Sequence, residues 1–222
     1  MKKQVNTAIA GLILATASIT SMATEVGGTY VTAGAMKIST DELDELKSIS
    51  GISVDDKDSA VSFVVGYQFD KNIAFEAGVI SEYDVSASAT TASGSAATGT
   101  LDGKSYSIPA ATTFTLSAKF DTGYTLGTKF SSSINESFDM YGKVGMYFWE
   151  SDLVLSSDNA IRYDGSDYTN VTLATEDGSD VYYGIGGSYK VDPTTSINAD
   201  YMKIKAAGAD ADSIGLSVSF DI

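Results

Sequence analysis

The chain has no histidine and no cysteine among its 222 residues, and it has only two prolines and one tryptophan. The lack of cysteine excludes disulfides, thiol chemistry and thiolate metal sites. Histidine is the side chain that most often serves as a general base near neutral pH, so its absence argues against an enzyme. We therefore expect a protein with no catalytic activity, no cofactor and no metal site.

Basic residues are scarce, because only 14 lysine and arginine residues accompany 29 aspartate and glutamate residues. This excess of negative charge repels nucleic acid, which we exclude as a partner. The hydrophobic fraction of 43% is nevertheless too high for a disordered acidic chain. The charged and apolar residues must therefore be segregated within a folded domain.

The N-terminus has the features of a secretory signal peptide. Two lysines precede an apolar stretch of thirteen residues (8–20), and the small residues Ser21 and Ala23 follow it. This stretch is shorter than the roughly 20 apolar residues that a membrane-spanning helix needs. We expect a signal peptide over residues 1–23 and one mature domain over residues 24–222, with a net charge of −17 once the two lysines are removed.

The rest of the chain alternates apolar and polar residues, as strands with one apolar face do. The pattern is clearest in the final segment, from Ile214 to Ile222. It predicts eight strands, near residues 27–36, 60–69, 73–79, 114–130, 138–148, 181–191, 197–201 and 213–222. The connections between them alternate in length, with short ones at 70–72, 131–137 and 192–195 and long ones at 37–59, 84–111, 150–180 and 204–212. Short turns at one end and long loops at the other are typical of an outer-membrane barrel.

Charged residues occupy the parity opposite to the apolar residues of these strands. They include Glu76, Lys119, Asp121, Lys129, Lys143, Lys190 and Asp200. A soluble barrel has an apolar interior, whereas these charges must be enclosed as mixed-sign pairs if the apolar parity faces lipid. We therefore predict an all-β fold, an eight-stranded antiparallel up-and-down transmembrane β-barrel. We also expect the strand from Phe114 to Phe130 to project beyond the bilayer.

The long connections hold most of the acidic residues. A capping-box pattern from Ser39 to Glu42 predicts one or two helical turns that end near Gly51. The segment 86–100 is rich in Ser, Ala, Thr and Gly, and it is expected to form a loop. The carboxylates of Asp55-Asp56-Lys57-Asp58 and Asp210-Ala211-Asp212 suggest calcium, but neither cluster has the spacing of an EF-hand loop, so a solvated acidic surface is favoured.

Several motifs resemble the OmpA-like transmembrane domain of the outer membrane protein β-barrel family. They are Val65-Gly-Tyr-Gln-Phe69, Ile73-Ala-Phe-Glu-Ala-Gly78, Tyr141-Gly-Lys-Val-Gly145, Tyr183-Gly-Ile-Gly-Gly-Ser-Tyr189 and the final strand. The resemblance implies an outer-membrane location, periplasmic termini, contact with lipid and lipopolysaccharide, and insertion by the barrel-assembly machinery. We expect a monomer. Relatives often continue into a peptidoglycan-binding domain, but this sequence ends at the predicted eighth strand, so we expect no such domain.

The resemblance also implies an interior network of carboxylates and lysines that plugs or gates a narrow channel. Its candidate members are Glu76, Lys119, Lys129, Lys143 and Asp200. These residues are either a gate or a static ion-pair core that fills the lumen and fixes the strand register, and the narrow bore favours the static core. Aromatic residues are expected to form two interfacial girdles, and the one beside the long loops contains Phe148, Trp149, Tyr182, Tyr183 and Tyr201.

The features above favour a structural and surface-interaction role in the bacterial cell envelope. The alternative is a narrow porin-like channel for small solutes or ions. A third class, an outer-membrane hydrolase, is disfavoured by the missing histidine. Measurements of conductance distinguish the first two classes.

Overall fold

A computed structural model describes residues 26–91 and 96–222. The elements in these residues are β1 (Thr29–Thr40), α2 (Asp44–Lys47), β2 (Ile52–Asp55), β3 (Lys57–Asp70), β4 (Ile73–Ile80), β5 (Tyr83–Thr90), β6 (Ala97–Leu101), β7 (Lys104–Ile108), β8 (Thr113–Phe120), β9 (Gly123–Asn135), β10 (Phe138–Tyr163), β11 (Ser166–Asp192), β12 (Thr195–Ala206) and β13 (Ala209–Asp221). The predicted signal peptide, residues 1–23, lies outside the described residues. None of the helices within the described part is long and apolar enough to span a membrane.

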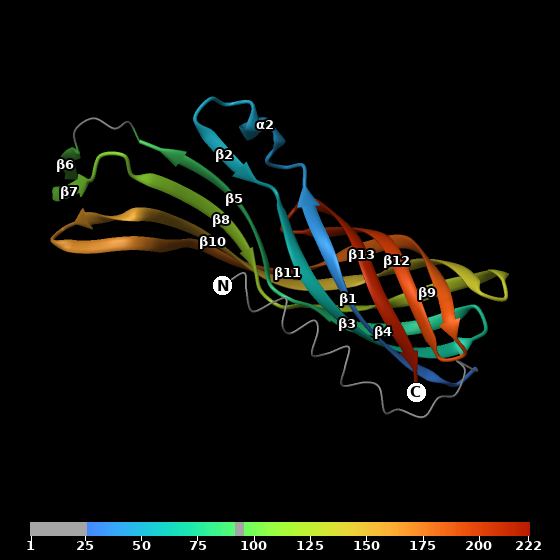
Figure 1. Cartoon of the computed structure of the whole chain (residues 1–222). Helices are drawn as coiled ribbons and strands as arrows, with labels where there is room; N and C mark the ends of the chain where they lie inside the picture. The colour runs from blue at the N-terminus through green and yellow to red at the C-terminus, as the bar shows by residue number, and fades with distance from the viewer. Residues whose placement is uncertain (1–25, 92–95) are drawn as a thin grey trace.

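Eight of the strands form a closed antiparallel ring (Figure 1). The order around the ring is β1, β3, β4, β9, β10, β11, β12 and β13, and β13 pairs with β1 from Tyr30↔Asp221 to Thr40↔Ala211. Sequence neighbours are therefore spatial neighbours, apart from the insertions after β1 and β4. The predicted eight-stranded antiparallel barrel is confirmed.

The outer surface of the ring is apolar, as the alternation predicts. Phe63, Phe75, Leu126, Ile185 and Ile214 are between 38% and 68% exposed there. The intervening residues face the lumen, and several of them are glycines that make room for large rings. A Cβ added to Gly66 would lie 2.1 Å from Cζ of Tyr30, so only glycine fits opposite that ring.

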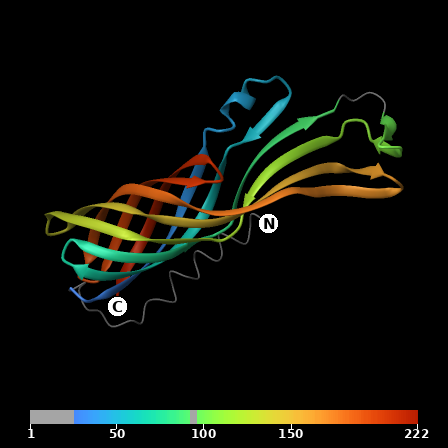
Figure 2. The same cartoon turned by 180° about the vertical axis from the view of Figure 1, so that it is seen from behind.

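Beyond one end of the ring, β10 and β11 continue and pair with further strands in a curved, open sheet, seen from two sides in Figures 1 and 2. β10 and β11 have 26 and 27 residues, and their outer parts extend past the barrel. β8 pairs with this part of β10, β5 pairs with β8, and β2 pairs with β5. We call the assembly of β2, β5, β8 and the outer parts of β10 and β11 the projecting sheet.

The projecting sheet corrects the prediction of long loops at 84–111 and 150–180. Segment 83–90 is a strand although it consists largely of alanine, serine and threonine, and the β6–β7 hairpin pairs with the tip of β10. Pairing with β8 stabilises β5 where side-chain propensity does not, because tertiary context overrides a weak local preference. The predicted strand from Phe114 to Phe130 is two strands, because the chain breaks at residues 121–122. β8 projects beyond the ring as expected, and β9 belongs to the ring.

Two smaller predictions also differ from the structure. The expected loop at 204–212 is a tight hairpin, in which Ala207 and Gly208 adopt positive φ angles of 54° and 78° between β12 and β13. The predicted helical turns are present as α2, but Ser39 belongs to β1 and Leu43 caps the helix without a side-chain hydrogen bond.

Candidate functional site

The lumen of the ring contains a buried ion pair between β4 and β10. Nζ of Lys143 lies 2.9 Å from Oε2 of Glu76, and the two side chains are 13% and 5% exposed. The hydroxyl of Tyr30 on β1 donates a hydrogen bond of 2.6 Å to Oε1 of the same carboxylate. Both oxygens of Glu76 therefore have partners from two different strands, which fixes the carboxylate in the lumen.

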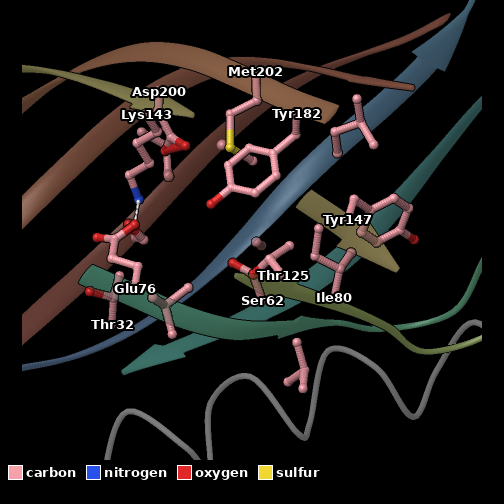
Figure 3. A pocket seen from close by; sticks show the side chains of 17 residues that line it. Thr32, Ser62, Glu76, Ile80, Thr125, Lys143, Tyr147, Tyr182, Asp200 and Met202 are labelled. Carbon is pink, nitrogen blue, oxygen red and sulfur yellow. Dashed lines mark ion pairs between the residues drawn. The ribbon is translucent and has the colours of Figure 1, made fainter. Parts of the chain in front are cut away.

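Lys129 and Asp200 complete a layer of charge around this pair. Lys129 lies opposite Lys143 in the β9–β10 register, and its Nζ lies 4.5 Å and 5.2 Å from the ring centroids of Tyr141 and Tyr30. Asp200 on β12 lines the same cavity as Lys143 and Glu76 (Figure 3). Two lysines and two carboxylates thus make up the ion-pair layer, in which the formal charges balance.

Lys119 is the predicted network residue that the structure places elsewhere. It lies on β8 in the projecting sheet, between Asp84 on β5 and Asp152 on β10, and it is exposed. The reason is the break between β8 and β9 at residues 121–122, which changes the parity of the chain. Phe120 and Gly123 both face inward and are three residues apart, so Lys119 faces outward while Lys129 faces the lumen.

A polar vestibule opens at the short-turn end of the lumen. It has a volume of about 380 Å³ and is lined by residues that include Lys71, Asp139 and Lys190. Lys190 forms an ion pair of 3.2 Å with Asp139. Between the vestibule and the ion-pair layer, Asn198 donates a hydrogen bond of 2.8 Å to Ser219, whose hydroxyl lies 2.7 Å from that of Thr32.

An apolar plug closes the opposite half of the lumen. It consists of Met36, Ile38, Ala60, Ile80, Tyr83, Phe120, Tyr147, Trp149, Tyr182, Met202, Ile204, Ala206 and Ala211. Tyr147 is 0% exposed and Ile38 and Ile204 are each 1% exposed, so water does not reach the middle of the plug. A cavity of only about 40 Å³ lies between the plug and the ion-pair layer (Figure 3).

The sequence interpretation missed the plug and assigned two of its members to the lipid-facing girdle. Trp149 and Tyr182 instead face the lumen, and the indole N–H of Trp149 donates a hydrogen bond of 2.8 Å to Asp180. The sequence does contain a sign of the plug, because the apolar residues of β10 change from even to odd positions along the strand. Apolar residues are at even positions up to Phe148, whereas the inward-facing Tyr147 and Trp149 are at odd positions.

The acidic clusters considered for calcium have basic or backbone partners. Asp56 binds Lys47 at 2.9 Å, and this hydrogen bond lowers the pKa of the Asp56 carboxyl group. Asp212 lies 3.4 Å from Lys203, and Asp210 lies 3.5 Å from Lys205. In the part of the chain that the structure describes, no three His, Cys, Asp or Glu side chains are grouped to hold a metal ion.

A closed ring of antiparallel strands, apolar outside and charged within, defines a transmembrane β-barrel of the outer-membrane class. The chain matches the outer membrane protein beta-barrel domain family over residues 7–221, and it belongs to this family. The protein is therefore located in the outer membrane, where the apolar belt contacts lipid. In barrels of this class the short turns face the periplasm and the longer extensions face the outside, so we infer that the projecting sheet is extracellular and the vestibule periplasmic.

Solved structures of the same architecture include two that align along most of the chain. Ail, the attachment invasion locus protein of Yersinia pestis, is 13% identical, and the alignment covers 89% of this chain and 100% of that one with a TM-score of 0.50. OprG from Pseudomonas aeruginosa is 12% identical, with coverage of 90% and 98% and a TM-score of 0.49. Likeness at such identities shows the fold alone. None of the curated proteins compared with the chain matches it.

Proposed function

We propose that this protein is a non-conducting, non-catalytic scaffold that anchors the projecting sheet to the bacterial surface. The apolar plug is the observation on which this proposal depends. A channel needs a continuous polar path, and Tyr147, Ile38 and Ile204 fill the lumen near the end of the ring from which the projecting sheet extends. With the lumen closed, the part of the molecule that can meet other molecules is the sheet outside the membrane.

The ion-pair layer has a static role in this proposal. Its four charges balance. Glu76 ties β4 to β10 and β1 through Lys143 and Tyr30, and Lys129 on β9 lies over the rings of Tyr30 and Tyr141. We propose that the layer fixes the register of the ring. Because the plug lies above it, loss of the ion pair leaves the lumen closed.

Single-channel recording in planar bilayers tests the scaffold proposal. We expect no conductance steps from the wild-type protein or from Lys143→Ala, and we expect steps from a variant that combines Tyr147→Ala with Ile204→Ala. The vestibule of about 380 Å³ and the adjacent charges support the alternative of a narrow channel. Steps from the wild type that grow in Lys143→Ala would establish a gated pore instead.

The remaining expectations about the protein's life in the membrane are also proposals. We propose a monomer that meets lipopolysaccharide in the outer leaflet and is inserted by the barrel-assembly machinery. We further propose that residues 1–23 are removed as a signal peptide, which leaves residues 24–222 as the barrel domain. N-terminal sequencing of the protein from outer membranes tests the cleavage, and the expected first residue is Thr24.

A further inference from the structure

One face of the projecting sheet is apolar across all five of its strands. Val54, Ala87, Leu116, Leu155 and Val171 are direct cross-strand neighbours on β2, β5, β8, β10 and β11. Because opposite residues in paired strands point to the same face, they form one continuous row.

Neighbouring rows on the same face are also largely apolar. The row nearer the barrel contains Val85, Ala118, Leu153 and Ala174. The next one contains Tyr83 and Phe120, whose rings stack at 4.7 Å in the plug, and continues with Ser151 and Glu176. The apolar face is therefore continuous with the plug. We call this apolar face of the projecting sheet the trough, and the rows of Leu116 and Leu153 its floor.

The opposite face of the same strands is polar. The row between the two floor rows contains Asp55, Ser86, Ser117, Val154 and Thr172, of which only Val154 is apolar. An isolated sheet in water has no reason to keep one face apolar, because the hydrophobic effect favours covering it. Leu116 and Val171 are nevertheless 41% and 47% exposed.

The segments that form and flank this floor are strongly acidic. Residues 41–58 contain seven acidic and two basic side chains, and residues 82–121 contain four acidic and two basic ones. Residues 150–180 contain eight acidic side chains and one basic one. The three segments together have a net charge of −14. Each edge strand carries part of this charge. Glu176 on β11 lies on the floor face, in the row of Phe120 and Ser151, whereas Asp55 on β2 lies in the polar row. From Ser166 to Val181, β11 pairs only with β10, so this edge is open.

From the apolar floor within an acidic border, we propose that the trough binds cationic amphipathic polypeptide segments. The apolar side of such a segment covers the floor, and its lysine or arginine side chains meet the acidic edges. This inference rests on the proposed function and specifies the partner of the projecting sheet.

The same charge argues against two other occupants. A second copy of the chain would bring two regions of −14 together, and acidic edge strands oppose pairing of like edges. The outer leaflet is anionic where lipopolysaccharide phosphates lie, so the border repels it. A cationic amphipathic segment satisfies both the apolar and the charged part of the surface.

Binding of a defined peptide to the protein in phosphatidylcholine nanodiscs tests the proposal. The probe is a fluorescein-labelled helix of about 18 leucine and lysine residues with one apolar face. A scrambled peptide of the same composition and a leucine–glutamate helix are the control probes, and signal from empty nanodiscs is subtracted. We expect the leucine–lysine helix to bind at least about tenfold more tightly than either control, and we expect added salt to weaken it severalfold.

Substitutions on the two faces of one strand localise the binding. Leu116→Thr combined with Leu155→Thr should weaken the probe about tenfold, whereas Val154→Thr, the same kind of change on the polar face, should not. Folding of each variant is checked by its electrophoretic shift on heating. If the double variant does not fold, Val171→Thr on the open edge tests the same row, with a severalfold loss expected.

Three results would overturn the proposal. They are equal binding of the scrambled or glutamate probe, unchanged affinity in the floor variants, and a dimer in sedimentation that the floor substitutions dissociate. The last result would make the floor an interface between copies. Failure of the proposed function would give a separate result. Conductance steps from a wild-type protein that still binds the probe would contradict the proposal of a non-conducting scaffold, but would not contradict binding at the trough.

Discussion

Removing either Glu76 or Lys143 alone should destabilise the barrel more than removing both. Removing one partner of a buried pair leaves an uncompensated charge, at a cost of roughly 3–5 kcal/mol. Glu76→Gln should lie at the upper end, because Lys143 and Lys129 then oppose each other across the β9–β10 register. Lys143→Met should lie at the lower end, because Tyr30 still donates its hydrogen bond of 2.6 Å to Glu76.

The double variant decides whether the layer works as a balanced set. Glu76→Gln with Lys143→Met leaves Lys129 and Asp200, one charge of each sign, so we expect it to be more stable than either single variant. The assay is urea unfolding in lipid vesicles. Trp149 is the single tryptophan of the chain and lies in the plug, so its fluorescence reports the lumen directly.

Lys119→Met is the matched control, since it removes a lysine from the exposed face of the projecting sheet. Exposed ion pairs contribute about 0–1 kcal/mol, so the change in stability should be small. A double variant as unstable as the sum of the two single changes would refute the balanced layer. It would mean that Glu76 and Lys143 act independently.

Three further predictions test the glycines, the carboxylates and the lipid-facing surface. Gly123→Ala should destabilise the barrel by about 1–3 kcal/mol in urea, because its Cβ would lie 2.3 Å from the Tyr147 ring, whereas Gly142→Ala has no contact closer than 3.7 Å and should be neutral. Burial and the neighbouring Asp58 raise the pKa of Asp84, so the Asp84 carboxyl group stabilises the folded sheet at low pH and loses that contribution as the pH rises. Hydrogen exchange of the β5 amides, corrected for intrinsic rates, should therefore show protection that falls with pH in the wild type. The Asp84→Asn variant should not show this fall. Leu126→Lys should cost about 2–4 kcal/mol of stability in lipid, and Leu116→Lys should cost much less because it lies outside the bilayer.

The ring could be predicted from sequence because its signal is repeated in most of its strands. Phe63, Phe75 and Ile214 each belong to a run in which every second residue is apolar, because that face of the strand contacts lipid. The opening strand, β1, is the exception with a weak pattern. The candidate site was only partly predictable for the same reason. Parity places Glu76 and Lys143 in the lumen, but it does not give the stagger of the ring that brings them within 2.9 Å.

The projecting sheet was not predictable as a sheet because its strands lack strong local preference. Segment 83–90 alternates small residues, with Ala87 and Ala89 on one face and Ser86 and Ser88 on the other. Alanine and serine have little β-propensity, so their strand depends on partners far away in sequence. Leu116 and Leu155 supply part of that context, and neither partner is visible from the segment itself.

At the membrane boundary the apolar residues change from the outward to the inward face of the strands, because the outer surface meets lipid on one side of the boundary and water on the other. Within the membrane the outward face must be apolar, whereas beyond it the outward face meets water and the apolar residues turn inward. The two-residue breaks at 81–82, between β4 and β5, and at 121–122, between β8 and β9, achieve this change. In β10 the apolar residues shift from Phe148 outside to Trp149 and Leu153 inside without a break. The positions of the change coincide with the plug, so the same residues that mark the membrane boundary also close the lumen. Exchanging Asp152 and Leu153 would place the apolar residue outward in the projecting part of β10, as in the membrane-spanning part. This exchange should therefore both expose the base of the trough and loosen the plug.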